Sequence, residues 1–317
     1  MTDLLRRPST WIAAALGLAL AVLPHLDTPG VPLIPKAQAV LIPLVIVGAV
    51  VAIVFGVFRR YVAGAVLLAG VLVAGSVLPI SQLAVPAEPA PDLTVMTFNL
   101  QYSQAPAAQV AELIVEHEVD VVTLLEVEEW YLEGLLSGPA GEQLPYRTGE
   151  VAGLAAEGSV ILSRYPLDFE FDFAQWYPAG DSPEQPVALV HHPDQTVRVV
   201  AVHPWPPIFE LTAPWHRALE DLNTWHREEA TDYPLVLAGD FNSSVSHPVY
   251  RRLAAGLTDT AGVAGVFPQA TWPVHPWIPQ FTALDHILVR DLQPVSWQTF
   301  ALPGSDHEGI ITGLRLP

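Results

Sequence analysis

The sequence predicts an α/β fold, two packed β-sheets flanked by helices, preceded by a helical segment that spans a membrane. Three observations lead to this expectation. Two long uncharged apolar runs lie within residues 1–83, short apolar runs of strand length recur through residues 93–317, and two stretches of helical spacing are interleaved with them. The chain therefore divides into an N-terminal membrane segment and a larger C-terminal domain.

Charge divides the 317-residue chain at the same place. Residues 1–83 hold 2 of the 33 acidic side chains and 5 of the 14 basic ones, so residues 84–317 keep 31 acids and 9 arginines. The acidic C-terminal part opposes tight binding of nucleic acid, whose phosphates are held by lysines and arginines. The chain has no cysteine, which excludes disulfides, thiolate metal sites and cysteine nucleophiles.

Residues 1–83 are expected to form a membrane anchor, with three transmembrane helices at about 11–26, 37–58 and 61–80. The second and third runs hold 22 and 20 residues without a charge, enough to cross about 30 Å of hydrocarbon. The first run is weaker, and a signal peptide is the alternative for it. The alternative for all three runs is that they are buried core helices of a soluble domain. Two uncharged runs of this length disfavour that alternative.

The charged residues around these runs predict their orientation. Only Arg59 and Arg60 separate the second run from the third, and the positive-inside rule puts this turn in the cytoplasm. The domain that follows then lies on the extracellular face, whether the first run is a signal peptide or a helix. Residues 84–92 are rich in proline and are predicted to be an extended linker.

The C-terminal domain alternates short apolar runs with helical stretches. Apolar residues at helical spacing predict helices at 105–117 and 211–230. Several of the short runs alternate or are β-branched, as strands are. The expected strands are 93–98, 119–125, 158–163, 187–192, 196–203, 234–239 and 284–289.

Polar side chains that suit chemistry stand at the ends of these runs. Each has an ordinary explanation when taken alone, such as a turn residue, a helix cap or a surface histidine. Six separate segments that supply only Asn, Asp, Glu and His nevertheless favour one site at a rim of the sandwich. The residues are Asn99, Glu126, His203, Asp240, Asn242, Asp285, Asp306 and His307.

The order of these residues resembles the endonuclease/exonuclease/phosphatase superfamily, which includes pancreatic-type deoxyribonuclease, neutral sphingomyelinases and inositol polyphosphate 5-phosphatases. The resemblance covers residues 93–316 and rests on "VILSRYPL" (160–167), "GDFN" (239–242), "LDHILV" (284–289) and "SDHEGI" (305–310). It implies a four-layer α/β sandwich of two mixed sheets. It also implies metal-dependent hydrolysis of a phosphodiester or phosphomonoester by an activated water.

The resemblance implies Mg²⁺ or Mn²⁺ as the cofactor, and hard cations of this kind prefer oxygen ligands. Glu126 is the leading metal ligand, assisted by Asn99 and by Asp306 as a second acid near the same rim. Gln101 stands where some members of the superfamily carry an acid, which favours one well-occupied ion over two.

The other polar residues are assigned to catalysis by the same resemblance. Asp240 would position or deprotonate the attacking water, while Asn242 and His203 would donate hydrogen bonds to phosphoryl oxygens. His307 would exchange a proton or hold the phosphate, with Asp285 orienting its ring. The strand-end place of His307 predicts partial exposure. Which of Asp240 and His307 is the general base stays open.

The substrate is expected to be a phosphoester whose identity the sequence does not specify. The membrane anchor favours a lipid headgroup, and the acidic charge argues against strong affinity for nucleic acid. An extracellular nuclease and a catalytically inactive surface binding module are the alternatives, and a transport role is disfavoured because the long apolar runs carry no charge. Trp205, Trp272 and Trp277 lie in Pro-rich loops, where they would contact lipid, stack on a base or cover the sandwich edge.

Overall fold

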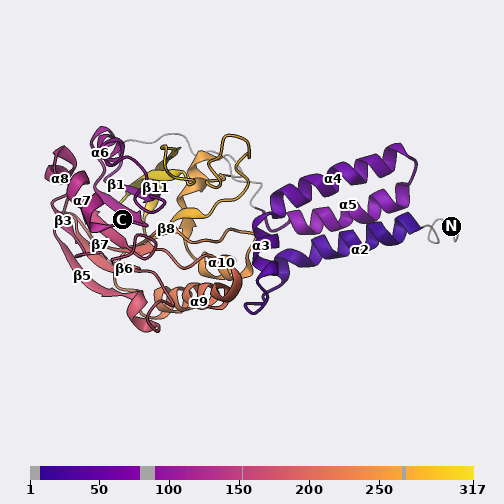
Figure 1. Cartoon of the computed structure of the whole chain (residues 1–317), viewed down its shortest axis with the longest axis horizontal. Coiled ribbons are helices and arrows are strands. Elements are labelled where there is room, and N and C mark those ends of the chain that lie inside the picture. Colours follow the sequence, from indigo (N-terminus) through magenta and orange to yellow (C-terminus); the bar gives the residue numbers. More distant parts are fainter. Residues whose placement is uncertain (1–7, 79–89, 152, 266–268) are drawn as a thin grey trace.

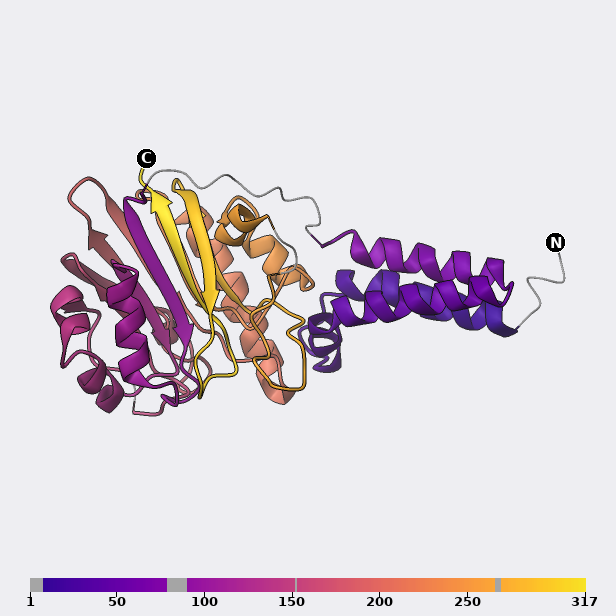
Figure 2. The same cartoon turned by 90° about the horizontal axis from the view of Figure 1, so that it is seen from above.

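The computed structural model describes residues 8–78, 90–151, 153–265 and 269–317, which form a helical bundle and an α/β sandwich (Figure 1). Three helices lie side by side in the bundle, and the N-terminal side of the chain is at its free end (Figures 1 and 2). A 3₁₀ turn and a short helix lie at the end that meets the sandwich. These elements are α2 (Pro8–Val22), η1 (Leu23–His25), α3 (Leu33–Ala39), α4 (Leu41–Val57) and α5 (Tyr61–Gly75).

The first sheet of the sandwich has six strands in the order β11-β12-β1-β2-β4-β3. Strands β1 and β2 are parallel and the other neighbours are antiparallel, so the sheet is mixed. The carboxyl ends of β1 and β2 therefore share one edge with the start of β12. The strands are β1 (Leu93–Asn99), β2 (Val121–Leu125), β3 (Tyr146–Arg147), β4 (Ser159–Ser163), β11 (Gln293–Phe300) and β12 (Gly309–Arg315).

The second sheet repeats this plan in the order β5-β6-β7-β8-β10-β9. Its one parallel pair is β7 with β8, and β10 runs antiparallel to β8, with Asp285 opposite Asp240. The strands are β5 (Leu167–Asp172), β6 (Pro186–His191), β7 (Thr196–Val202), β8 (Leu235–Asp240), β9 (Thr258–Asp259) and β10 (Asp285–Arg290).

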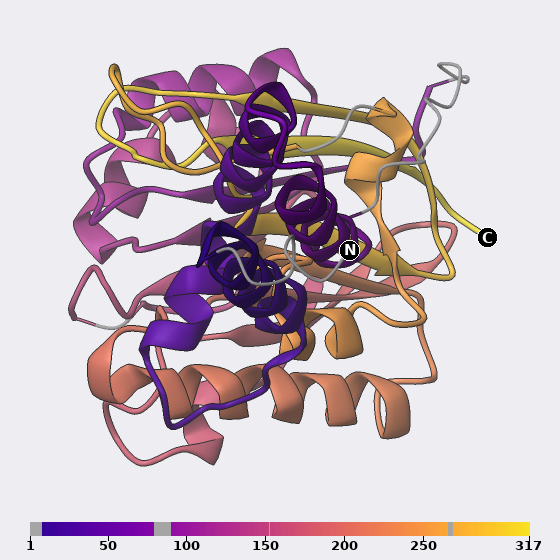
Figure 3. The same ribbon diagram turned by 90° about the vertical axis from the view of Figure 1, so that its right-hand side faces the viewer.

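Helices cover the outer face of each sheet, which makes the four layers that the sequence predicted (Figure 3). One apolar core lies between the sheets, and two further cores lie between each sheet and its helices. The first sheet is covered by α6 (Ala107–Glu116), α7 (Glu129–Leu135) and α8 (Pro139–Gln143), and the second by α9 (Thr212–Glu228) and α10 (Pro248–Leu253). Three short turns, η2 (Phe173–Trp176), η3 (Phe209–Leu211) and η4 (Thr260–Ala264), connect these elements.

The expected strands and helices are confirmed with small shifts at their ends. Alternating and β-branched apolar runs located most of the buried strands, but five strands were not anticipated: β3, β5, β9, β11 and β12. Strand β5 lies at a sheet edge and carries acids among its apolar residues, so its exposed pattern does not stand out from a loop.

The helical bundle differs from the three continuous spans expected from the sequence. The run at 37–58 is broken at Val40, where α3 and α4 meet at 69°. Pro43 explains the break, because its ring would clash with the carbonyl of Ala39 in a continuous helix. The third run is helical only to Gly75, and residues 79–80 and most of the predicted linker at 84–92 lie outside the described residues.

Within the described residues, one helical stretch, Pro8–His25, is long and apolar enough to cross a membrane. A second qualifies if the bent pair α3 and α4 counts as one span, and α5 is apolar but shorter. Large apolar side chains cover the outside of the bundle as well as its interior. The exposed ones include Trp11, Ile12, Leu18, Ile46, Val47, Ile53, Val57, Phe58, Tyr61 and Leu72.

Candidate active site

The eight predicted site residues converge at one edge of the sandwich. The carboxyl ends of β1, β2, β7 and β8 meet there with the starts of β10 and β12. A cleft of about 420 Å³ opens at this edge. Six of the eight residues line it, and Asn99 and Asp285 lie buried behind them.

Asn99 connects the two sheets at the floor of the cleft. Its amide nitrogen donates to Glu126 Oε1 and to Asp240 Oδ2, both at 3.1 Å. Its amide oxygen accepts the backbone N–H of Gln101 at 2.9 Å. Asn99 thus holds two acids in place, and its service as a metal ligand stays a prediction.

His307 forms the second part of the floor and is held by Asp285. Its Nδ1 lies 2.9 Å from Asp285 Oδ2, while Nε2 faces Asp240 Oδ2 at 3.7 Å. Thr271 donates its hydroxyl to the same oxygen of Asp285 at 2.6 Å. The expectation of partial exposure was wrong: only 7% of His307 is exposed, because both sheets and the loop bearing Thr271 enclose its ring.

The mouth of the cleft holds the half-buried residues Glu126, Asp306 and Asn242. Glu126 Oε2 accepts the backbone N–H of Tyr102 at 3.1 Å, and Asp306 Oδ2 accepts the indole N–H of Trp272 at 3.0 Å. The amide of Asn242 donates to the Pro204 carbonyl at 3.0 Å.

Strained backbone orients two of these side chains. Glu126 and Asn242 have φ values of 54° and 47°, a left-handed conformation that costs a side-chain-bearing residue about 1–2 kcal/mol. Gly304, with φ of 90°, lets the loop before His307 approach the turn after β1, since a Cβ there would lie 2.3 Å from the Gln104 carbonyl oxygen. These loops thus keep an unfavourable backbone conformation that orients the side chains at the cleft.

Burial and mutual charge shift the pKa values of the site. Burial, with repulsion from Asp285, raises the pKa of Asp240 to about 7 although His307 opposes the shift. Burial would lower the pKa of His307, but the carboxylates of Asp285 and Asp240 outweigh it and raise the pKa to about 10. Burial and the charge of His307 lower the pKa of His203 to about 3, so its ring is neutral at pH 7.

The mouth fits a divalent cation by its chemistry. Burial raises the pKa of Glu126, and the nearby charge of Asp306 adds to the shift. In the described part of the chain no lysine or arginine forms an ion pair with either acid. Two carboxylates without a lysine or arginine partner among the described residues lie at this one cleft, and carboxylates are the hard oxygen donors that Mg²⁺ or Mn²⁺ takes.

A second group of acidic and histidine side chains also brings its ligand atoms close together. Asp240, Asp285 and His307 each offer an atom within 4.8 Å of the others. One ring nitrogen of His307 is already bonded to Asp285, an arrangement typical of a carboxylate that orients a histidine. The contact with Asp285 thus leaves only one ring nitrogen of His307 free for another partner, whereas Glu126 and Asp306 at the mouth could hold a cation.

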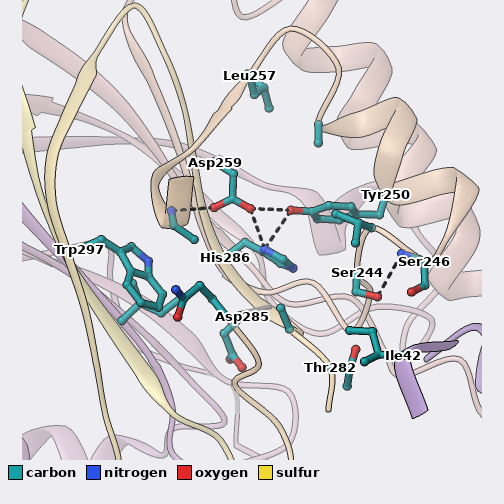
Figure 4. Close-up of a pocket in the computed structure, with 16 residues that line it drawn as sticks. Ile42, Ser244, Ser246, Tyr250, Leu257, Asp259, Thr282, Asp285, His286 and Trp297 are labelled. Carbon is teal, nitrogen blue, oxygen red and sulfur yellow. Dashed lines mark hydrogen bonds and ion pairs between the residues drawn. The ribbon is translucent and has the colours of Figure 1, made fainter. Parts of the chain in front are cut away.

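A second cavity of about 160 Å³ shares Asp285 with the site (Figure 4). Its wall carries His286, whose Nδ1 lies 2.9 Å from the Tyr250 hydroxyl and 3.3 Å from Asp259 Oδ2. The other ring nitrogen lies 3.1 Å from the Ser243 carbonyl oxygen. Both nitrogens of His286 are thus engaged, one with α10 and β9 and the other with the loop after β8.

Two residues of the site were missed from the sequence. Thr271 binds Asp285, and threonine in a loop gives no local signal. Lys36 lines the cleft although it belongs to α3, outside the sandwich. Its one distinguishing mark in the sequence is that no other lysine occurs in the chain.

Comparison with known proteins gives a consistent result for the sandwich. A family model described as "Endonuclease/Exonuclease/phosphatase family" matches residues 96–307. No curated protein matches the sequence.

Solved structures share the fold at low sequence identity. A humanized TDP2 from D. rerio has 16% identity and a TM-score of 0.57, covering 70% of this chain and 98% of its own. Sphingomyelinase C from Streptomyces griseocarneus has 19% identity and a TM-score of 0.50, covering 71% and 99%. The 3′ phosphatase NExo from Neisseria, bound to a product DNA hairpin, has 21% identity and a TM-score of 0.51, covering 69% and 98%.

Proposed function

Because this chain belongs to the endonuclease/exonuclease/phosphatase family, a family of phosphoesterases, we propose that it is a membrane-anchored hydrolase that cleaves a phosphoester outside the cell with a divalent metal ion. The observation that carries the proposal is the convergence of six strand ends, each with a polar residue, on one cleft. The same set disfavours an inactive binding module, since a protein that only binds has no need of so many buried ionisable groups.

The orienting contacts suggest which residue takes the proton of the attacking water. Asp285 holds the ring of His307 and favours its charged form, so His307 at neutral pH is an imidazolium that binds a phosphoryl oxygen or protonates the leaving group. Asp240, with a pKa near 7 and no lysine or arginine partner among the described residues, is then the general base.

Other residues hold the substrate and the metal. The neutral ring of His203 and the amide of Asn242, which line the cleft, would donate to phosphoryl oxygens. Glu126 and Asp306 would hold Mg²⁺ or Mn²⁺, with Asn99 fixing the orientation of Glu126. A bound divalent cation neutralises charge that develops on the phosphoryl group.

The surface of the bundle supports membrane anchoring. A soluble helical bundle keeps one apolar face inward, but α2, α4 and α5 expose large apolar side chains to the outside. Backbones approach closely where glycines meet, as α2 and α5 do at Gly17 and Gly70. Close packing through small residues is typical of helices in lipid.

The free end of the bundle supports an extracellular catalytic domain. Arg59 and Arg60 are exposed in the turn between α4 and α5, at the end far from the sandwich (Figure 1). Three exposed aromatic residues lie at this same end: Trp11 in the first turn of α2, Phe58 directly after α4, and Tyr61 at the start of α5. Aromatic residues mark a membrane interface and arginines mark its cytoplasmic side, so the sandwich falls on the opposite face.

Metal-dependent turnover by the full-length chain tests the proposal. Purified protein in detergent should hydrolyse bis(p-nitrophenyl) phosphate with Mg²⁺ or Mn²⁺ and lose activity in EDTA. Glu126→Gln should raise the metal concentration for half-maximal activity at least tenfold, because it removes a charged oxygen donor from the mouth.

Gln101→Ala is the matched control, since its side chain lines the same cleft but brings no charge. It should leave metal activation nearly unchanged. Equal losses from the two variants would contradict a metal site centred on Glu126. DNA, RNA, sphingomyelin, glycerophospholipids and inositol phosphates assayed beside the chromogenic ester would separate nuclease from lipid-directed activity.

A further inference from the structure

One wall of the catalytic cleft comes from the N-terminal segment. Lys36 and Ala39 of α3 line the cleft together with the catalytic residues of the sandwich. Lys36 is the only lysine of the chain, and no arginine is among the described residues that line the cleft. The positively charged lysine of this cleft therefore belongs to α3 and not to the sandwich.

Buried polar contacts hold α3 against the sandwich. His247 Nε2 lies 3.0 Å from the Pro35 carbonyl oxygen, and the backbone N–H of Ser244 donates to His247 Nδ1 at 3.0 Å, which leaves Nε2 to donate to Pro35. Near the end of α3, the amide of Gln38 donates to the carbonyls of Leu23 and Leu26, each at 2.8 Å. The position of Lys36 is thus set by the residues on both sides of it.

Ion pairs and a hydrogen bond also join the segment before α3 to α9 and α10. Asp27 lies 2.7 Å from His216 Nε2 and 2.6 Å from Arg252 Nη2, and Arg251 donates to the Pro24 carbonyl at 2.5 Å. The bundle therefore sits directly on the sandwich, in addition to its connection through the predicted linker.

The cleft wall beside Lys36 is apolar. The Lys36 ammonium lies 4.5 Å from the ring centroid of Phe209, which is 68% exposed. The neighbouring lining residues, which we call the apolar strip, are Trp205, Pro206, Pro207, Ile208 and Leu211. A cation beside an apolar strip suits a molecule that joins an anionic group to a hydrocarbon chain.

The cleft lies where the bundle meets the sandwich. Helix α3 is at the sandwich end of the bundle, and only Val40 separates it from α4 (Figures 1 and 2). In the membrane orientation proposed above, this junction is level with the outer headgroups of the bilayer. A lipid headgroup would reach the cleft there without leaving the membrane.

We propose that Lys36 and the apolar strip form a substrate subsite for an amphiphilic phosphoester held in the membrane. Lys36 pairs with an anionic oxygen of the headgroup, and the strip holds the start of the hydrocarbon chain. This inference rests on the proposed function for the reaction itself, but the subsite makes its own contribution to binding.

The test compares two chromogenic esters that share the scissile bond and differ only in chain length. Full-length protein in phosphatidylcholine vesicles is given hexadecyl p-nitrophenyl phosphate or methyl p-nitrophenyl phosphate. Wild type should cleave the hexadecyl ester with at least tenfold higher kcat/KM. Lys36→Gln should lower kcat/KM for that ester about tenfold, chiefly through KM, and Lys36→Arg should retain it.

Arg217→Gln serves as the control, because it removes the same charge from an exposed site on α9 that does not line the cleft. It should leave both esters unaffected. Equal losses in Lys36→Gln and Arg217→Gln would overturn the subsite in favour of long-range attraction. So would equal cleavage of the two esters by wild type.

Binding without turnover separates this inference from the proposed function. Isothermal titration of the full chain in detergent, without metal, should show hexadecyl phosphate binding that Lys36→Gln weakens about tenfold, and much weaker binding of methyl phosphate. Unchanged hexadecyl phosphate binding in Lys36→Gln would overturn the subsite even if the enzyme is active. Lys36-dependent binding without hydrolysis of any ester would support the subsite and contradict the proposed reaction.

Discussion

At the scale of single residues, His307 carries the strongest expectation for the mechanism. Its ring is fixed by Asp285 at 2.9 Å and faces Asp240 across 3.7 Å. His307→Ala should lower kcat about 10²–10⁴-fold, the usual loss for a positioned acid or base. Asp285→Asn should cost less, because it disturbs the orientation of the ring but leaves the imidazole in place.

Steady-state kinetics on the best ester found for wild type measure both effects, with circular dichroism as the check on folding. His307 is buried, so the folding check decides whether a loss belongs to chemistry or to packing. A folded His307→Ala protein with near-normal kcat would show that the family mechanism does not operate here.

The pair of the half-buried Asp259 and the buried His286 in the second cavity should make stability depend on pH (Figure 4). Burial alone would lower the pKa of His286, but the hydrogen bond and charge of Asp259 outweigh this effect and raise it. Burial alone would raise the pKa of Asp259, but its interaction with His286 lowers it. Because its pKa is raised in the folded state, His286 contributes fully to the free energy of unfolding below its unfolded pKa of about 6.5. This contribution is lost as pH rises through the folded pKa. Because its pKa is lowered in the folded state, Asp259 contributes fully to the free energy of unfolding above its unfolded pKa of about 4. This contribution is lost as pH falls through the folded pKa.

Asp259→Asn should therefore lower the thermal midpoint of the full chain most near pH 5.5 and progressively less as pH rises above 6.5. Differential scanning calorimetry in detergent measures this difference. Asp168→Asn is the control, because its partner His191 lies at the surface, where such pairs contribute little. A destabilisation by Asp259→Asn that is the same at pH 5.5 and pH 8.5 would contradict the charged pair.

At the scale of elements, the contact between α2 and α5 should be sensitive to a single methyl group. A Cβ added at Gly70 would lie 2.2 Å from the Gly17 carbonyl oxygen, so the helices must separate to accept it. Gly70→Ala should destabilise the bundle by about 1–3 kcal/mol, the usual cost of overpacking.

Gly75→Ala is the matched substitution, since it lies in the same helix and a Cβ added there would have no neighbouring atom within 4 Å. It should be neutral or slightly stabilising, because alanine favours helix. Thermal unfolding in detergent, followed by limited proteolysis of α2, compares the two variants. Equal stability would mean that α2 and α5 do not cross at these glycines.

At the scale of the whole molecule, the arginines at the free end of the bundle predict an external sandwich. Proteinase K added to intact spheroplasts should remove residues 84–317 while a tag placed in the turn at Arg59 stays protected. Inside-out vesicles should give the opposite pattern. Degradation of the sandwich only after lysis would reverse the topology and leave the cleft facing the cytoplasm.

The sequence by itself determined the two sheets flanked by helices and eight of the residues that converge at the cleft. Strand and helix periods are local properties, so buried strands such as β1 and β8 were found within a residue or two. The eight residues could be picked out because each stands at or beside the end or the start of an apolar run, and strand ends of this kind share one edge of the sandwich. Edge strand β5 was missed, since its exposed residues follow no burial pattern.

Only the tertiary structure decided how far the site extends and which residues enclose it. The Pro35 carbonyl and His247 are 212 residues apart, and no local spacing encodes such a contact. For that reason the sequence predicted Lys36 in an anchor and His307 at a partly exposed strand end, whereas in the fold Lys36 lines the candidate active-site cleft and His307 is buried between the sheets. Local periodicity fixes which residues lie inward on each element, but the packing of distant elements against one another fixes what they meet there.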